Sequence, residues 1–513
     1  MKTFDYIVVG GGTAGCVLAA RLSQDAGVRV LLLEAGAAEP SAAMADPAAW
    51  PRLWHTPVDW AYETVPQSGA DDGVLQWPRG KVLGGSSGIN GMLHFRGDRS
   101  SYDAWEAAGA TGWNYDALLP FFKRSERADR GDPLYRGKHG PMRVGPGPAT
   151  DPLWEACFEA AVEAGYPPNE DDNGAVAEGT SWHELNVVGR KRQSAADAYL
   201  APAARRPNLT VVTDARVLRL LVEHATCQGV QYGAGGQRHT ALADREVVLT
   251  AGVIGTPQLL LLSGVGHAQH LRGLGIEVVA DLPGVGGNLH DHPKSQAAYT
   301  TTRPVRPAAN ARKPLVLLRS EPAQAPDLEI IFSEFPIHPR WSPGPEDGYS
   351  VLFGLMTPAS RGSLRLASTD PDQPPLIDPG YLADPSDVAR MIKGLRVARQ
   401  IGAAHALAPF RDKELFPGTG TETGEACRAY LRGTITTFFH PVGTCKIGTD
   451  AMSVVDPQLK VRGIGQLRIA DASVMPSVPS GHTNAPVLAI AERAASLLTG
   501  EEAEAKELLS GDW

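Results

Sequence analysis

The chain has 513 residues, of which 43% are hydrophobic and 20% charged, and its formal net charge at pH 7 is −9. This composition is that of a globular protein with room for two or more domains. An acidic chain without a basic stripe is not expected to bind nucleic acid. The longest apolar runs, such as residues 259–262, are far too short for a transmembrane segment, and the early first strand leaves no room for a signal peptide.

The cysteines are few and scattered, and no two of them form a CxxC pair. Such a set predicts reduced thiols rather than a disulfide framework or a zinc site. We therefore expect no metal and a cytoplasmic protein, with a peripheral position at the inner membrane left open. The cysteines are Cys16, Cys157, Cys227, Cys427 and Cys445.

The first 34 residues carry a nucleotide-binding pattern. An apolar run at residues 6–9 leads into a glycine turn, a helical pattern follows, and a second apolar run at 28–33 ends in Glu34. The glycines at positions 10, 12 and 15 have the G-x-G-x-x-G spacing that lets a backbone approach a pyrophosphate at a helix N-terminus. An acid placed like Glu34 can accept a hydrogen bond from a ribose hydroxyl. The pattern predicts a bound dinucleotide and does not distinguish FAD from NAD.

The middle of the chain predicts a different kind of unit. Residues 138–150 are rich in glycine and proline, which indicates a boundary. Residues 327–335, 349–358 and 362–368 read as strands of an antiparallel sheet. Residues 387–401 place apolar side chains on one helical face, which predicts packing against a core. That face carries Val388, Met391, Ile392, Leu395 and Ala398.

Several further motifs follow one another along the chain. RGKVLGGSSGINGMLHFRG (79–97) contains a second glycine turn, LTAGVIGTPQLLLLSGVG (249–266) reads as strand, turn and helix, and LPGVGGNLHDH occupies 282–292. The last two are FFHPVGTCKIG (438–448) and RIADASVMPSVPSGHTNAPVLAIAERAASLL (468–498). Together they closely resemble the glucose–methanol–choline (GMC) oxidoreductases, a family of FAD-dependent alcohol oxidases and dehydrogenases.

The resemblance implies an α/β fold in which a Rossmann-like FAD-binding domain carries an inserted α+β substrate domain built on an antiparallel sheet. The FAD domain would comprise residues 1–150, 187–295 and 440–513, and the substrate domain residues 151–186 and 296–439. The residues expected around the FAD, from the glycine motif and the resemblance together, are Gly10, Gly12, Thr13, Ala14, Gly15, Glu34, Ala35, Val82, Gly85, Asn90, Gly91, Met92, Leu93, Val217, Ala251, Asp471, Ala472, Thr483 and Asn484.

Two departures from the family pattern affect what can be transferred. Some members attach FAD covalently through a histidine just before the asparagine of the glycine–serine motif, and this chain has Ile89 there. We therefore expect non-covalent FAD. The segment from about 296 to 326, which in relatives helps to cover the substrate entrance, is short here and predicts a more open pocket.

Two histidines are the candidates for catalysis. His440 follows two phenylalanines and precedes a proline, so it is either a buried core residue or a base. The resemblance makes His440 the expected proton acceptor during hydride transfer from an alcohol to the flavin N5 atom. His482 would hold the substrate oxygen, and the two roles could be exchanged. The helix after His482 is expected to begin near Thr483 or Asn484 and to end before Gly500.

The substrate is less well specified than the cofactor. Phenylalanines could line an apolar pocket, namely Phe332, Phe335, Phe353, Phe438 and Phe439. A choline-like cation would need an aromatic cage or a buried carboxylate, and nothing in the sequence directs Glu329 or Glu334 inward. A primary alcohol, aliphatic or aromatic, is therefore favoured over choline. Oxygen or a quinone-type acceptor would reoxidise the flavin, with crowding by Phe438 favouring a dehydrogenase, and a hydroxynitrile lyase on the same fold is the rival activity.

Overall fold

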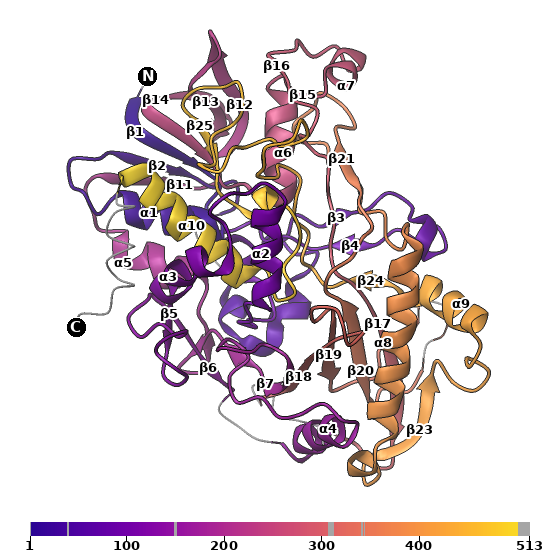
Figure 1. The fold of residues 1–513 in the computed structure, drawn as a ribbon. Helices are drawn as coiled ribbons and strands as arrows, with labels where there is room; N and C mark the ends of the chain where they lie inside the picture. Colours follow the sequence, from indigo (N-terminus) through magenta and orange to yellow (C-terminus); the bar gives the residue numbers. More distant parts are fainter. Residues whose placement is uncertain are drawn as a thin grey trace.

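The computed structural model describes residues 2–500 apart from residues 38–40, 148–150, 306–311, 340, 341 and 343. Two large sheets organise this part of the chain (Figure 1). The sheets are joined by segments that cross from one to the other several times. The described architecture is therefore α/β with a separate antiparallel sheet, as the sequence predicts.

The first sheet has the strand order β11-β2-β1-β14-β13-β12, and β25 pairs with β14. Pairing is parallel from β11 to β14 and to β25, and antiparallel from β14 through β13 to β12. The strands are β1 (Lys2–Val9), β2 (Val30–Leu33), β11 (Leu209–Val212), β12 (Arg216–Glu223), β13 (Thr226–Ala234), β14 (Gln237–Leu249) and β25 (Leu467–Ile469). β2 is buried at all of its positions, as expected for a strand covered on both faces. Helices α1 (Thr13–Leu22) and α10 (Asn484–Thr499) pack side by side in front of this sheet (Figure 1).

The second sheet is antiparallel, with the order β23-β17-β20-β19-β18-β7 and β24 paired to β17. Its strands are β7 (Gly179–Trp182), β17 (Pro293–Thr301), β18 (Pro314–Leu318), β19 (Leu328–Ser333), β20 (Gly348–Leu355), β23 (Arg411–Phe416) and β24 (Thr436–Thr437). Helix α8 (Pro385–Ala403) covers one face, together with α4 (Pro152–Glu163) and α9 (Gly424–Thr434). The predicted face of α8 is confirmed, since four of its side chains are buried there and Val388 is half-buried against them.

Strand alternation divides the residues of the second sheet between its two faces. In β19, Leu328, Ile330 and Phe332 pack in the core under α8. Glu329 and Ile331 lie on the opposite face of this sheet. In β20, Val351 and Phe353 join the same core. The face away from α8 is the one that the active-site residues approach.

The predicted strand at 362–368 does not belong to the second sheet. β21 (Ser363–Arg365) pairs with β22 (Leu376–Asp378) in a two-stranded ribbon, and Leu364 and Ile377 pack into the core of the first sheet. The proposed boundary at residue 295 falls inside β17. Residues 362–381, which were predicted to belong to the substrate domain, thus pack in the core of the first sheet. The predicted division of the chain into two domains stays a prediction.

The remaining elements are shorter. The helices are α2 (Arg99–Ala107), α3 (Tyr115–Ser125), α5 (Ala201–Ala203), α6 (Gly252–Leu262) and α7 (Ala268–Gly273). The strands are β3 (Tyr62–Glu63), β4 (Gln76–Trp77), β5 (Glu126–Ala128), β6 (Met142–Pro146), β8 (Glu184–Leu185), β9 (Val187–Val188), β10 (Lys191–Arg192), β15 (Val265–Gly266) and β16 (Ala280–Asp281). The five cysteines are buried free thiols.

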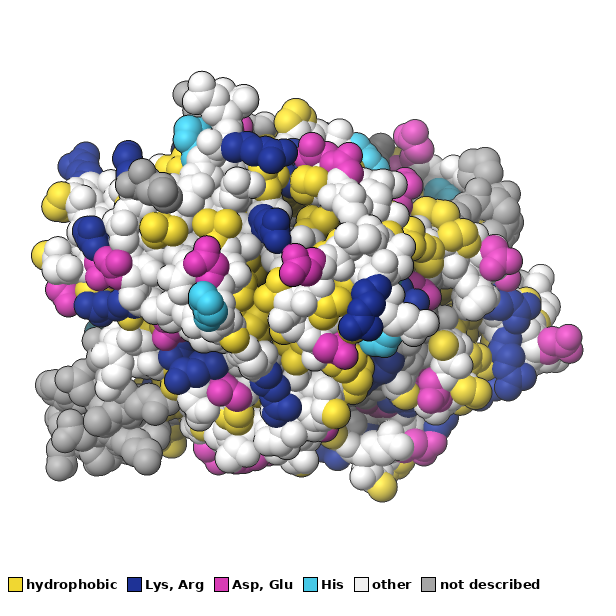
Figure 2. Space-filling view, turned by 90° about the horizontal axis from the view of Figure 1, so that it is seen from above, with side chains coloured by type: hydrophobic (Ala, Val, Ile, Leu, Met, Phe, Trp, Pro, Cys, Tyr) yellow, Lys and Arg dark blue, Asp and Glu magenta, His cyan; other side chains and the backbone are white. Residues whose placement is uncertain are grey.

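The surface carries charges of both signs. On the face shown in Figure 2, acidic and basic side chains are interspersed among uncharged ones and neither kind gathers into one patch. No helix in residues 2–500, as far as they are described, is long and apolar enough to cross a membrane. The segment predicted to be a short cover, about 296–326, includes most of β17 and all of β18, while residues 306–311 lie outside the described part.

Candidate active site

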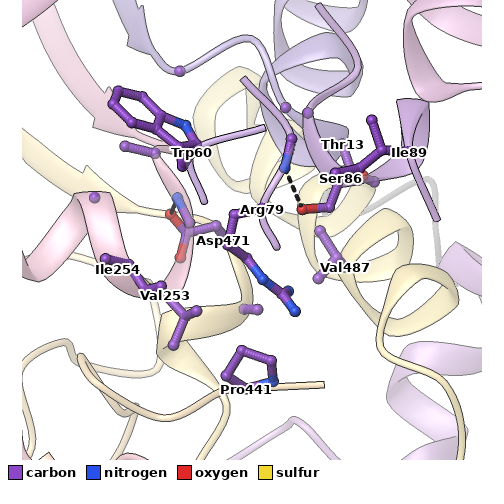
Figure 3. Close-up of a pocket in the computed structure, with 18 of the residues that line it drawn as sticks. Thr13, Trp60, Arg79, Ser86, Ile89, Val253, Ile254, Pro441, Asp471 and Val487 are labelled. Carbon is purple, nitrogen blue, oxygen red and sulfur yellow. Dashed lines mark hydrogen bonds between the residues drawn. The ribbon is translucent and has the colours of Figure 1, made fainter. Parts of the chain in front are cut away.

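A long cavity begins at the carboxyl ends of β1, β2 and β14 and extends to the second sheet. In open α/β sheets this edge is where ligands bind. Figure 3 shows Thr13, Ser86, Ile89 and Val487 on one side of the cavity, and Trp60, Asp471, Val253 and Ile254 on the other. Segments far apart in the chain thus enclose one site.

The glycine turn after β1 leaves space on the cavity side only. A Cβ atom at Gly10, whose φ is +102°, would lie 2.7 Å from the Thr250 carbonyl oxygen, and one at Gly15 would lie 1.9 Å from the Gly10 oxygen. At Gly12 the nearest protein atoms would be 3.9 Å away. The protein's own packing therefore requires Gly10 and Gly15, whereas the open side of Gly12 fits close approach by a ligand.

Glu34 ends β2 and binds the glycine turn directly. Its two carboxylate oxygens accept hydrogen bonds from the backbone N–H groups of Gly11 and Gly36, each at 2.7 Å. Burial raises the pKa of Glu34 to about 7. A carboxylate has further lone pairs, so Glu34 can hold the turn and still accept from a ribose hydroxyl.

Helices α1, α6 and α10 all begin at the cavity. Among the described residues no side chain caps α1 or α10, so their first N–H groups and positive dipole ends are available to an anionic ligand. Asp471 instead accepts from Gly252 N at 2.8 Å and from Thr256 Oγ1 at 2.6 Å at the start of α6. The predicted limits of the last helix are confirmed, because α10 begins at Asn484 and Gly500 follows it with φ +81°.

The second glycine turn approaches the first. Gly85 has a φ of +52°, and a Cβ there would lie 2.7 Å from the Gly12 Cα atom. Asn90 follows, and its Oδ1 accepts hydrogen bonds from Met92 N at 3.1 Å and from Arg192 Nη1 at 2.8 Å. Ile89, between Gly85 and Asn90 in the chain, lines the cavity, and its side chain offers no nucleophile for covalent attachment of a cofactor.

Most residues predicted to surround a dinucleotide do line the cavity. These are Gly10, Gly12, Thr13, Ala14, Glu34, Ala35, Gly85, Asn90, Gly91, Met92, Leu93, Val217, Ala251, Asp471, Ala472, Thr483 and Asn484. Two predicted residues do not. Gly15 packs beneath the turn, and Val82 is buried in a small apolar cluster with Met44 and Ile89.

His440 and His482 meet at the far end of the same cavity. Their ring centroids are 4.7 Å apart although 42 residues separate them in the chain. The Nδ1 atoms of His440 and His292 are 3.0 Å apart, and His482 Nε2 lies 2.9 Å from Glu329 Oε1. Each catalytic candidate therefore has one nitrogen bound to a protein partner and one nitrogen left for a ligand.

The electrostatics keep His440 neutral. Burial lowers the pKa of His440 well below its usual value, and His482, His292, Arg79 and Lys294 lower it further. Burial and the neighbouring His482 lower the pKa of His292 to about 3. In this neutral pair one imidazole donates and the other accepts, which orients the ring of His440.

A buried carboxylate fixes the backbone around His440. Asp291 accepts hydrogen bonds from His440 N at 2.7 Å, from the Tyr381 hydroxyl at 2.5 Å and from the Thr437 hydroxyl. The residue before His440, Phe439, has a φ of +69°, which is costly for a non-glycine residue. The contacts of Asp291 thus stabilise a strained turn immediately before the candidate base.

Aromatic side chains form part of the wall near the histidines. Phe438 stacks on His440 with centroids 5.5 Å apart, and Phe439 contacts Trp54 at 5.2 Å and Trp50 at 6.5 Å. Trp50, Trp54, Phe438 and Phe439 all line the cavity. Two of the five predicted substrate phenylalanines are therefore at the site.

The other three phenylalanines are placed elsewhere, so this part of the prediction needs correction. Phe332 and Phe353 lie on the α8 face of the second sheet and belong to its core. Phe335 follows β19 and is 48% exposed. Strand alternation is the cause for Phe332, because its neighbour Ile331 is the residue that faces the cavity.

The sequence reasoning also missed several residues at the site. His292, Lys294, Arg79, Trp50 and Trp54 lie near the histidines and were not singled out. Glu329 was considered, and the structure directs it to His482. The stretch LHDHPK at 289–294 carried a usable signal, since it concentrates titratable side chains at the start of a strand.

Comparison with known proteins identifies the family. Two models described as GMC oxidoreductase match residues 4–294 and 358–491. The chain belongs to the GMC oxidoreductases. It is 41% identical to the mitochondrial choline dehydrogenase of Mus musculus, over 98% of this chain and 90% of the relative.

Solved structures of other GMC oxidoreductases share the fold. Pyridoxine 4-oxidase from Mesorbium loti superposes with a TM-score of 0.93 at 36% identity, covering 96% of this chain and 98% of that one. A fungal aryl-alcohol oxidase superposes with a TM-score of 0.87 at 25% identity, covering 98% and 99% of the two chains. This GMC oxidoreductase is thus an FAD-dependent enzyme that acts on CH–OH donors. The open side of Gly12 and the uncapped helices fit the pyrophosphate of that cofactor.

Proposed function

We propose that this GMC oxidoreductase converts a primary alcohol, aliphatic or aromatic, to the aldehyde. The proposal rests on the pair of imidazoles at the end of the cavity, whose rings are 4.7 Å apart. When bound, FAD supplies the acceptor for the hydride that leaves the alcohol carbon. The chain's own residues bind the hydroxyl group and remove its proton.

His440 is the proposed proton acceptor. With Nδ1 engaged by His292, its Nε2 atom is the nitrogen available to the alcohol. The lowered pKa keeps the ring neutral, and Nε2 can accept the proton when Nδ1–H donates to His292. His482 presents Nδ1 to the same oxygen, because its Nε2 is engaged by Glu329. Positioned acid–base catalysis of this kind contributes about 10²–10⁴ in rate. The exchanged arrangement, with His482 as base, is supported by the carboxylate on its other nitrogen.

Choline is the second candidate substrate. Two observations favour it: the similarity to choline dehydrogenases, and the buried Glu329, whose second oxygen has no hydrogen-bond partner among the described residues. Against it, Arg79 and Lys294 place cations in the cavity wall, where they would repel a quaternary ammonium group. We therefore favour an uncharged or anionic alcohol.

Three finer points belong to the same proposal. FAD is held without a covalent bond, because Ile89 occupies the position of the attaching histidine. Crowding by Phe438 near His440 favours a quinone-type acceptor over oxygen. The enzyme acts in the cytoplasm.

An anaerobic panel of alcohols tests the proposal, with flavin absorbance as the readout. Bleaching by benzyl alcohol or a short aliphatic alcohol supports it, whereas bleaching by choline alone would replace it with the second candidate. An unchanged spectrum with aldehyde release from a cyanohydrin would indicate a lyase. His440→Ala should slow bleaching by about 10²-fold or more with FAD still bound, and near-normal bleaching would exclude His440 from the mechanism.

A further inference from the structure

Lys294 presents a cation to the cavity beside the histidine pair. It lies at the start of β17 and lines the cavity, and its Nζ atom is 4.7 Å from the ring centroid of Phe439 and 5.3 Å from that of Phe438. It forms no hydrogen bond or ion pair with the described residues. Lys294 is half-buried, and a charged side chain in such a position normally has a paired partner.

The sheet directs this side chain toward the substrate end of the cavity. Ala297 and Tyr299 of β17 face the α8 core, so alternation sends Lys294 to the other side. Its neighbour across the strand pair is Gly354, and a Cβ there would lie 2.4 Å from Phe438. The absence of that side chain lets Phe438 lie against the sheet beneath the ammonium group, and the same ring stacks on His440.

The surrounding charges leave the ammonium group without a full counter-charge. Burial lowers the pKa of Lys294 to about 8, opposed by Asp291, so the side chain is mostly protonated at neutral pH. The charged and titratable groups nearby are Asp291, Arg79 and His440. Glu329 lies in the same register row on the other side of Gly354, where it is bound to His482. The carboxylate oxygens of Asp291 already accept three hydrogen bonds from other groups, and Arg79 adds a second positive charge. The site therefore favours an anion in the adjoining space.

The aromatic part of the cavity wall indicates the kind of molecule to which the anionic group should be attached. Trp50, Trp54 and Phe439 form a connected set of rings on the cavity surface. Such a surface suits a flat aromatic ring. The ring would lie between Lys294 and the two imidazoles, which bind the hydroxyl group that reacts.

We propose that Lys294 binds an anionic oxygen substituent of the substrate, so that the preferred substrates are primary alcohols of aromatic rings that carry a carboxylate or phenolate group. This inference rests on the proposed function and extends it to a substrate class. Lys294 acts here as a specificity-determining residue: its charge influences His440, but it does not itself accept the proton or the hydride.

Substrate preference in the FAD-loaded enzyme tests the inference. We compare kcat/KM for 3- and 4-(hydroxymethyl)benzoate with kcat/KM for their methyl esters, which keep the ring and lose the charge. The wild-type ratio should favour the anions by about tenfold or more. Lys294→Met should reduce this ratio by about tenfold, and Lys294→Arg should keep most of it. Lys413→Met is the matched control, because Lys413 is exposed on the neighbouring strand β23 and should leave the ratio unchanged.

A binding measurement gives a second readout that does not depend on turnover. Titration of the holoenzyme with benzoate by calorimetry should give a dissociation constant that is about tenfold higher in Lys294→Met. If no alcohol bleaches the flavin, the proposed function fails while the benzoate titration still tests Lys294. A wild-type enzyme that prefers the esters, or a Lys294→Met variant with unchanged ratio and benzoate affinity, overturns the inference. A variant whose main defect is weaker FAD binding would overturn it too, because Lys294 would then serve the cofactor.

Discussion

Glu329→Gln should reveal which imidazole takes the proton. Glu329 is buried, and its Oε1 atom lies 2.9 Å from His482 Nε2. Glutamine keeps the size of the side chain and can still accept that hydrogen bond, so the substitution mainly removes a charge. A hydrogen bond to a charged group is stronger than a neutral one by about 1–1.5 kcal/mol.

The size of the effect separates the two mechanisms. If His482 only holds the alcohol oxygen, the loss of about 1–1.5 kcal/mol corresponds to a fall of about fivefold to tenfold in the rate of flavin reduction. If His482 accepts the proton, the variant leaves a buried imidazolium without its counter-charge. Breaking such a pair costs about 3–5 kcal/mol, which corresponds to a fall of more than about 100-fold.

The assay is anaerobic stopped-flow reduction of the bound flavin by the best alcohol of the panel. Glu334→Gln serves as the matched control, because Glu334 is half-buried, pairs with Lys313 and lies outside the cavity lining. FAD content and melting temperature should stay at wild-type values in both variants. A reduction rate in Glu329→Gln within twofold of wild type would refute the reasoning, since Glu329 would then have no influence on His482.

Three further predictions concern the cofactor and the lysine. Gly12→Ala should fold normally, because its Cβ would meet no protein atom closer than 3.9 Å, and should lose FAD affinity, because the Cβ would enter the cofactor cavity. Gly15→Ala should lower the free energy of unfolding by about 1–3 kcal/mol. Calorimetry of the apoproteins with FAD titration checks both variants, and equal FAD affinity in Gly12→Ala and wild type would contradict the predicted cofactor site. Acid precipitation should leave the yellow chromophore in the supernatant, as Ile89 provides no attachment point, and a coloured pellet would show a covalent bond elsewhere. The preference for (hydroxymethyl)benzoates over their esters should be present below pH 8 and decline above it, because Lys294 loses its proton with a pKa of about 8 while the carboxylate stays ionised; a ratio that stays constant from pH 6 to pH 10 would exclude Lys294 as the determinant.

The nucleotide end of the site could be predicted because its signals are local. The turn after β1, the helix that follows it and the acid at the end of β2 lie within one stretch of 34 residues. Backbone requirements at Gly10 and Gly15 come from contacts within this unit and with β14. Such a unit is recognisable in any chain, whereas residues further along, such as Val217 and Asp471, were expected from the family resemblance.

The substrate end could not be predicted as well, because its contacts span long distances in the sequence. His292 reaches His440 across 148 residues, and Glu329 reaches His482 across 153. Their apolar character suggests Phe332 and Phe353 as substrate-contacting residues, but a buried core such as the one under α8 requires the same kind of side chain. Strand alternation excludes one combination of these residues: Glu329 and Phe332 are three positions apart in one strand, so they cannot face the same side of the sheet.

One short segment accounts for much of what was missed. Asp291 accepts a hydrogen bond from the backbone of His440, His292 orients its ring, and Lys294 adds a cation nearby. These three residues lie at or just before the start of β17. The residues before this strand also bond to the segment that carries His440, because Phe438 N donates to His292 O and Val442 N donates to His290 O. A substitution at Asp291 or His292 would therefore disturb the position of His440, whereas a substitution at Lys294 changes only the charge near it. That separation lets substrate preference change at position 294 while the geometry of the imidazole pair is kept.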